Sequence, residues 1–333
     1  MCPDAAIDTA EPVSQVPAIG RSTRLSAQPP SISLIICTHN PRPDYLARTL
    51  ESLAKQTLPL DKWDLVLLDN ASKDRLDANW DISWHPCGRH ARDEKIGLAL
   101  ARIRAIQETR GELLIFADDD NVLAKDFLEQ ALKVAESYPY LGVFGAGAIQ
   151  PEFAVQPAPE VVDLIGLLAL RTVAEARWSN HYEDWPTIPW GAGLCVTRQV
   201  AEGYVALINR LWNTSVIGRN GQHLFTGEDD LFSWVAVQLG KGFGIFPNLK
   251  LTHLIPGERV TRSYFLRLIA DKSTSSAVIR YNMFGTHPES LSLTAIIRML
   301  AHGFRRGWFS FRCRCAEIAG NRRARRMIGT GKG

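Results

Sequence analysis

The sequence predicts an α/β fold in which a mostly parallel, mixed sheet is flanked by helices on both faces, followed by a C-terminal helical extension. Short apolar runs alternate with segments of helical periodicity through the first part of the chain. Such alternation requires crossover helices that cover both faces of a parallel sheet. Further helical patterns, and then a strongly basic segment, follow the last strand-like stretch.

Three strands are expected in the first part of the chain. Residues 32–37 form an apolar run that stops at a polar loop, which is typical of a buried strand. After a segment with leucines on one helical face, residues 63–68 predict a second buried strand. A helix over about 97–109 then leads into a third strand over 113–117.

Each of these strands ends in a polar cluster, namely Thr38/Asn40, Asp69/Asn70 and Asp118/Asp119/Asp120. In open α/β sheets, ligands bind beyond the carboxyl ends of the strands. The three loops contain neither G-x-G-x-x-G nor G-x-x-x-x-G-K-[ST], so a dinucleotide site and a P-loop lose their main support.

The pattern changes after residue 150. Residues 151–159 are typical of a loop, and 189–196 predict a turn that leads into a strand. The segment 227–230 precedes a helical run over 231–239. Helical segments are expected from 260 to about 314, followed by a basic tail.

Composition and charge exclude several classes of protein. The 333 residues carry 38 Lys+Arg against 35 Asp+Glu, a net charge of +3, and 46% are hydrophobic, as in a folded domain with a sizeable core. The near balance argues against a dedicated nucleic-acid binder. The longest apolar run, 141–149, is too short to span a membrane, and residues 1–30 show no secretory signal. With six scattered cysteines, a cytoplasmic location is expected.

The Asp118-Asp119-Asp120 cluster is the first sign of chemistry. Three adjacent carboxylates repel each other, so a divalent cation that prefers oxygen ligands is a natural occupant. In an extended segment Asp118 and Asp120 point to the same side, which suits one carboxylate on a metal and the other on a ribose. A solvated acidic turn or a helix N-cap is the alternative.

Gly227-Glu228-Asp229-Asp230, at the start of a predicted helix, is the second sign. A carboxylate held near the positive end of a helix can serve as a general base. Simple N-capping is again the alternative.

Taken in order, these segments resemble the family 2 glycosyltransferases of the GT-A fold, over about residues 31–260. The resemblance rests on four stretches: SLIICTHNPRPDYLARTLESLAKQTLPLDKWDLVLLDNASKD, the pair KIGLALARIRAI and GELLIFADDDNVLAKDFL with its D-x-D motif, PWGAGLCVTRQVAEGY, and GEDDLFSWVAVQLG with its "ED" motif. It implies an inverting hexosyltransferase that uses a nucleotide-sugar donor, as in polysaccharide biosynthesis.

The resemblance also implies roles for single residues. The donor nucleotide would be bound by Thr38, Asn40, Asp69, Arg102, Asp118 and Asp119. Among these, Asp69 would accept a hydrogen bond from the uracil imide, which makes a UDP-sugar the expected donor. Asp120 and His253 would bind Mn²⁺ or Mg²⁺ that bridges the donor phosphates. Asp229 would be the catalytic base, with Glu228 beside it to orient donor or acceptor.

Two further segments concern the acceptor, a glycan or lipid-linked hydroxyl. The aromatic side chains of 178–190 would form an acceptor-side lid, with Trp190 the best candidate, or a satellite hydrophobic cluster. From Arg298 onward, ten basic residues face a single acid, Glu317, and aromatic side chains are interleaved. This segment would lie on an anionic membrane or dock on the catalytic domain. No nucleic-acid partner is expected.

The expected organisation is a flexible leader (1–30), a GT-A catalytic domain (31–260), a C-terminal helical extension (261–315) and a basic tail (316–333). Two alternatives to glycosyl transfer stay open. The chain could be a non-catalytic GT-A scaffold that binds a membrane or a partner. It could also be a sugar-phosphate nucleotidyltransferase, although that class needs a basic Gly-rich loop after the first strand, which residues 38–43 do not provide.

Overall fold

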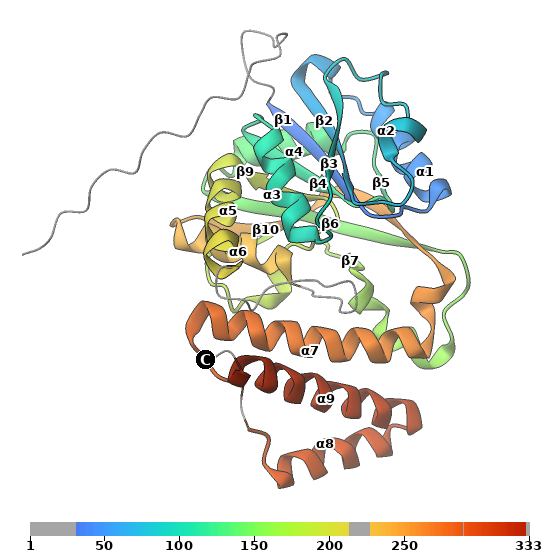
Figure 1. Cartoon of the computed structure of the whole chain (residues 1–333), viewed down its shortest axis with the longest axis vertical. Coiled ribbons are helices and arrows are strands. Elements are labelled where there is room, and N and C mark those ends of the chain that lie inside the picture. The colour runs from blue at the N-terminus through green and yellow to red at the C-terminus, as the bar shows by residue number, and fades with distance from the viewer. Residues whose placement is uncertain (1–30, 213–226, 289, 331–333) are drawn as a thin grey trace, which may run out of the picture.

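A computed structural model describes residues 31–212, 227–288 and 290–330 of the chain. A mixed sheet forms its centre, and three long helices lie below the sheet in Figure 1. The strands are β1 (Ile32–Thr38), β2 (Trp63–Asn70), β3 (Gly88–Asp93), β4 (Leu113–Ala117), β5 (Asn121–Leu123), β6 (Leu141–Phe153), β7 (Arg171–Thr172), β8 (Arg177–Ser179), β9 (Leu194–Thr197) and β10 (Gly242–Ile255).

The α-helices are α1 (Pro43–Ala54), α2 (Leu76–Asn79), α3 (Leu98–Glu108), α4 (Phe127–Ser137), α5 (Arg198–Trp212), α6 (Glu228–Gln238), α7 (Arg262–Phe284), α8 (Leu293–Arg305) and α9 (Trp308–Thr330). Short 3₁₀ helices are η1 (Leu60–Lys62), η2 (Pro159–Leu168), η3 (Trp185–Thr187) and η4 (Gly257–Val260). The predicted strands at 32–37, 63–68 and 113–117 and the helix at 97–109 are thus confirmed within one or two residues.

The sheet has the order β3-β2-β1-β4-β9-β6-β10-β5, with β7 beside β6 and β8 beside β10. β1 is parallel to both β2 and β4, and β6 is parallel to β10. β9 is antiparallel to β4 and to β6, and β5 is antiparallel to β10. The sheet is therefore mostly parallel but mixed, as the sequence predicts.

Helices cover both faces because side chains alternate along each strand. On one face Ile35 and Leu68 pack in a core with α3, α5 and α6. On the other face Ile36 and Leu67 pack in a core with α1 and α4. Since the central strands are buried on both sides, they are nearly continuous apolar runs and not alternating ones.

Two expectations about secondary structure were wrong. The segment expected to be a loop from Pro151 continues β6 as far as Phe153, paired with β10. Proline is tolerated there because β7 and β9 have ended and β6 has an open edge on that side. The segment 316–333 is not a tail after the helices, since α9 runs to Thr330.

The C-terminal helices begin at a defined cap. Thr261 caps α7, its hydroxyl accepting a hydrogen bond from Tyr264 N at 3.3 Å. α9 packs on α7, and α8 packs on α9, so that α8 is the outermost of the three (Figure 1). None of the helices in the described parts of the chain has the length and apolar character that a bilayer crossing requires.

Candidate active site

The carboxyl ends of β1, β2 and β4 lie side by side in the sheet. Thr38 pairs in register with Asp69, and Ile36 pairs with Ala117, the residue before Asp118. The three polar clusters that the sequence shows at separate strand ends therefore meet at one edge. This is where the fold of an α/β sheet places ligands.

The loop after β1 is fastened to the loop after β2 by Asn40. Its backbone N–H donates to Ser72 Oγ at 2.9 Å, and its side-chain Oδ1 accepts from Lys73 N at 2.8 Å. Asn40 has φ 50°, in the left-handed region, which Asn adopts more readily than most residues. Asn40 thus shapes this edge, and its contact with a nucleotide stays a prediction.

Asp69 is buried and already holds several donors. Its Oδ1 accepts from Ser72 N at 2.8 Å, its Oδ2 accepts from Leu76 N at 3.4 Å, and Arg92 forms an ion pair with it. Burial opposes ionisation, but the hydrogen bonds from Ser72 and the Arg92 guanidinium hold the Asp69 pKa below its usual range. The carboxylate is therefore charged at neutral pH and rigidly oriented.

The three aspartates after β4 have separate neighbours. The Thr38 hydroxyl donates to Asp119, and burial together with the charge of Asp120 raises the Asp119 pKa to about 6. Burial and the same neighbour raise the Asp118 pKa. The extended geometry expected here is wrong, because Asn121 N donates to Asp118 O at 3.1 Å and closes a turn.

Asp120 lies beside two basic side chains from the far part of the sheet. The antiparallel pairing of β5 and β10 places His253 opposite Asn121, next to Asp120. His253 Nε2 lies 3.3 Å from Asp120 Oδ2, and Arg259 Nη1 lies 3.0 Å from the same oxygen. Burial opposes ionisation of Asp120, but the hydrogen bond and charge of His253, with the charge of Arg259, lower its pKa.

This group of side chains fits a divalent ion only in part. Over the described residues, no group of three or more His, Cys, Asp and Glu side chains converges on one point. Asp120 and His253 do converge, and His253 Nδ1 is buried without a hydrogen-bond partner among the residues that the structure describes. Mg²⁺ sites in enzymes often take one or two protein ligands and fill the rest with substrate phosphates and water. The pair therefore fits an ion that a diphosphate helps to hold.

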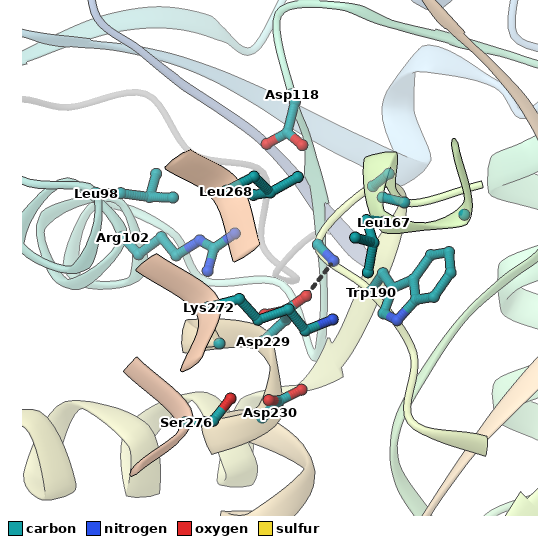
Figure 2. A pocket seen from close by; sticks show the side chains of 15 residues that line it. Leu98, Arg102, Asp118, Leu167, Trp190, Asp229, Asp230, Leu268, Lys272 and Ser276 are labelled. Atoms are coloured by element: carbon teal, nitrogen blue, oxygen red, sulfur yellow. Dashed lines mark hydrogen bonds between the residues drawn. The ribbon is translucent and has the colours of Figure 1, made fainter. Parts of the chain in front are cut away.

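Asp229 stands at the first turn of α6, where the helix dipole favours negative charge. Its Oδ2 accepts a hydrogen bond from Gly191 N at 2.9 Å, drawn as a dashed line in Figure 2. At the neighbouring Asp230, burial together with the charge of Asp229 raises the pKa to about 8. The side chain of Glu228 lies outside the described part of the structure.

Asp118 and Asp229 line the same cavity of about 260 Å³ (Figure 2). Arg102 also lines this cavity; it is 4% exposed, and its guanidinium lies 5.5 Å from the centre of the Phe116 ring. The predicted approach of Arg102 to the aspartate cluster is consistent with this position. Helix α7 closes the other side with Leu268, Lys272 and Ser276, which the sequence did not single out.

Trp190 is the aromatic side chain of 178–190 that lines this cavity. The Arg171 guanidinium lies over its ring, 3.7 Å from the centroid, and burial lowers the Arg171 pKa to about 10. Tyr182 instead packs in a separate aromatic cluster with Trp234 and Phe284. The expected lid therefore reduces to Trp190, and the rest of the segment is closer to the alternative of a satellite cluster.

Residues 33–153 match the family model described as "Glycosyl transferase family 2". The match runs from β1 to the end of β6 and contains the polar strand ends described above. These residues form a family 2 glycosyltransferase domain.

Named relatives agree with the family. EpsH of Bacillus subtilis (strain 168) is 31% identical over 32% of this chain and 30% of its own length. Polypeptide N-acetylgalactosaminyltransferase 14 of Homo sapiens is 26% identical over 46% of this chain and 26% of its own. The chain thus spans less than a third of either relative. The mannosyltransferase PcManGT from Pyrobaculum calidifontis has a similar fold, with TM-score 0.51 and 18% identity over 92% of this chain and 80% of that one.

The family 2 match covers the predicted donor-side residues from Thr38 to Asp120 and ends before Asp229 and His253. The roles of Asp229 and His253 stay predictions that the resemblance implies. Sequence reasoning missed Arg259, Arg171 and the α7 residues of the cavity. For α7 a faint signal exists, because Leu268, Lys272 and Ser276 recur every four residues and so share one helix face.

Proposed function

We propose that this family 2 glycosyltransferase transfers a sugar from a UDP-sugar to a hydroxyl of a glycan or lipid-linked acceptor, by a single displacement with inversion. One observation carries the proposal: Asp118, at the end of β4, and Asp229, at the start of α6, line one cavity. The first lies where a donor nucleotide would bind, and the second is held by a backbone donor as a base must be.

Asp120 and His253 would hold Mn²⁺ or Mg²⁺ on the donor side. When bound, such an ion acts as a Lewis acid that neutralises the charge growing on the departing diphosphate. Arg259 brings a further positive charge to the same Asp120 oxygen and is in position to contact a phosphate. The mannosyltransferase of similar fold was solved with GDP-Man and Mn²⁺, a nucleotide sugar and an ion of these classes.

Asp69 is the residue that we propose to recognise a uracil base. Ser72, Leu76 and Arg92 donate to its carboxylate and hold it in one orientation. In our proposal the imide N–H of uracil donates to the same carboxylate. This N–H is the group that distinguishes uracil at this position.

Asp229 accepts the proton of the attacking hydroxyl. The Gly191 N–H fixes one of its oxygens and leaves the other for the acceptor. Asp230 does not compete for this role, because a carboxyl with a pKa of about 8 is protonated at neutral pH and cannot accept a further proton. With one base and no carboxylate assigned as nucleophile, a single displacement follows.

The test compares two neighbouring variants. Nucleotide release is measured with UDP- and GDP-sugars in the presence of Mn²⁺ or Mg²⁺. We expect Asp229→Asn to lower turnover by about 10²–10⁴-fold, the usual contribution of a general base. Asp230→Asn is the matched control and stays within a few-fold of wild type, because Asn resembles the protonated acid.

Three outcomes would contradict parts of the proposal. Equal turnover of wild type and Asp229→Asn would remove Asp229 as the base. Release from GDP-sugars alone would remove the uracil role of Asp69. No release from any donor, together with no UDP binding in calorimetry with Mn²⁺, would favour the non-catalytic scaffold.

A further inference from the structure

Helix α8 exposes an apolar face, and together with Trp308 at the start of α9 we call it the α8 stripe: Leu293, Ile297, Phe304 and Trp308. These side chains are 73%, 57%, 66% and 66% exposed. Leu293, Ile297 and Phe304 differ by 4 and 7 residues, which in a helix of 3.6 residues per turn places these three side chains in one line. Trp308 begins α9 and stacks on Phe311, with 5.2 Å between ring centroids. A large apolar stripe is thus left open to solvent.

Basic side chains border the stripe on both sides. Arg298 and Arg305 are exposed and follow Ile297 and Phe304 by one residue, a rotation of about 100° around the helix. On the opposite side a groove of about 480 Å³ lies between α8 and α9, with Leu300 on its α8 wall and Arg322 and Arg326 on its α9 wall. The surface therefore has an apolar centre and basic margins.

Helices α8 and α9 form a hairpin, and α9 binds this hairpin to the rest of the protein. Thr274 Oγ1 on α7 donates to Gly320 O at 3.1 Å, and Arg323 donates to Asp271 of α7. Ile328 is buried in the same core as side chains of α5 and α6. The side chains of the α8 stripe are exposed, and three of them belong to α8, the outermost of the three C-terminal helices in Figure 1. The α8 stripe is consequently not a part of the core.

We propose that the α8 stripe is a docking surface for an anionic lipid bilayer. Apolar side chains of an interfacial helix enter the boundary between headgroups and acyl chains, and its arginines remain among the lipid phosphates. Trp308 suits this depth, because indole rings prefer the membrane interface.

Charge selects the lipid surface over a second copy of the chain. From Arg298 to the end of the chain, ten basic residues accompany one acid. Two such surfaces brought face to face would repel each other, whereas anionic headgroups attract them. A nucleic acid would use the arginines but would leave the apolar stripe in water. The combination therefore fits anionic lipid.

The test is cosedimentation of the full chain with vesicles, which requires no activity. Vesicles of phosphatidylcholine alone are compared with vesicles of phosphatidylcholine and phosphatidylglycerol in equal parts. We expect wild type to pellet with the second kind only and to be released by added salt. Ile297→Ser/Phe304→Ser and Arg298→Gln/Arg305→Gln should each weaken binding by about tenfold or more.

Matched controls change the same chemistry elsewhere on the surface. Val155→Ser/Val162→Ser removes two exposed apolar side chains, and Lys55→Gln/Lys62→Gln removes two exposed positive charges. Both should bind vesicles as wild type does. Unchanged thermal unfolding of every variant, followed by circular dichroism, shows that the effects are not due to misfolding. The release of wild type from anionic vesicles by added salt tests the contribution of charge without any variant.

Several results would overturn the proposal. These are wild type that stays in the supernatant with anionic vesicles, equal binding to neutral vesicles, or a stripe variant that pellets like wild type. A wild-type dimer that the stripe variant dissociates in sedimentation velocity would instead make this surface an interface between copies.

Discussion

His85 is a buried imidazole far from the cavity and is 2% exposed. Its ring packs edge-on against Trp63, with 4.1 Å between the ring centroids. Its Nδ1 accepts a hydrogen bond from Cys87 N at 3.1 Å, and its Nε2 has no partner among the described residues. Burial lowers the His85 pKa from 6.5 to about 4, so the imidazole is neutral in the folded protein at neutral pH.

This histidine should make the fold sensitive to acid. Between about pH 6.5 and 4 the unfolded chain binds a proton at His85 that the folded chain does not, so the stability is present above pH 6.5 and is lost as the pH falls. The loss amounts to up to about 3 kcal/mol. We expect His85→Gln to be less stable than wild type at pH 7 but to lose less stability on acidification.

Urea unfolding at pH 7 and pH 4.5 measures this difference. His181→Gln is the control, because His181 is exposed. It should keep the wild-type dependence on pH. If His85→Gln loses as much stability as wild type, then His85 is not the responsible group.

At this scale the sequence indicates the acidic residues of the site better than the basic ones. Asp118, Asp120 and Asp229 stand in short motifs next to strand or helix ends, so local reasoning suffices to find them. Arg259 reaches Asp120 across 139 positions of sequence. No local sequence pattern predicts such a contact, because it depends on how β5 and β10 pair.

Among the glycines of the described residues, Gly320, where α9 crosses α7, would bring an added Cβ closest to a neighbouring atom. A Cβ added at Gly320 would lie 2.2 Å from Ala270 O and 2.8 Å from Ser273 Cβ. The first of these neighbours is backbone, which cannot move aside as a flexible side chain can. Glycine at this position therefore sets the distance between the two helices.

We expect Gly320→Ala to destabilise the protein by about 1–3 kcal/mol, the usual cost of overpacking, although alanine is the better helix former. Gly329→Ala on the same helix is the control, since nothing lies within 4 Å of its added Cβ. It should be neutral or slightly stabilising. Equal free energies of unfolding for the two variants would show that α9 does not press on α7 as described.

The sequence predicts central elements more readily than peripheral ones. β1, β2 and β4 are buried on both faces, and their apolar runs are visible without any tertiary information. β3 is an edge strand with the half-buried sequence GRHARD, which lacks an apolar pattern. The sequence of the last turns of α9 predicts a basic tail and not a helix. The helix there is stabilised by burial of Ala324 and Ile328 against residues that are distant in sequence, which no local pattern shows.

On the scale of the whole molecule, the small net charge of +3 conceals an uneven distribution. Three aspartates line the cavity, namely Asp118, Asp229 and Asp230, whereas arginines gather on α8 and α9. The α8–α9 hairpin nevertheless belongs to the body of the fold, since Ala324 and Ile328 share a core with β1, β2 and β4. The catalytic unit and the extension are consequently expected to unfold together.

A chain that ends at His287 should show this dependence. It lacks Ile318 and Ile328, which are 6% and 4% exposed in the full chain. Burial of one such side chain contributes about 1.5–3 kcal/mol, so we expect a loss of at least about 3 kcal/mol and a clearly lower melting temperature. Calorimetry against a chain that lacks only residues 331–333 checks this. An unchanged melting temperature would mean that the hairpin folds as a separate unit.

Helix α7 has the cavity on one side and the hairpin on the other. Leu268 and Lys272 line the cavity, and Asp271 and Thr274 hold α9. Packed helices lie about 8–10 Å apart, so the steps from α7 to α9 and from α9 to α8 set a separation of about 20 Å. If α8 binds a surface, the cavity lies at this fixed distance from that surface. The protein would then select acceptors by reach as well as by shape, because only a hydroxyl presented at that distance meets Asp229.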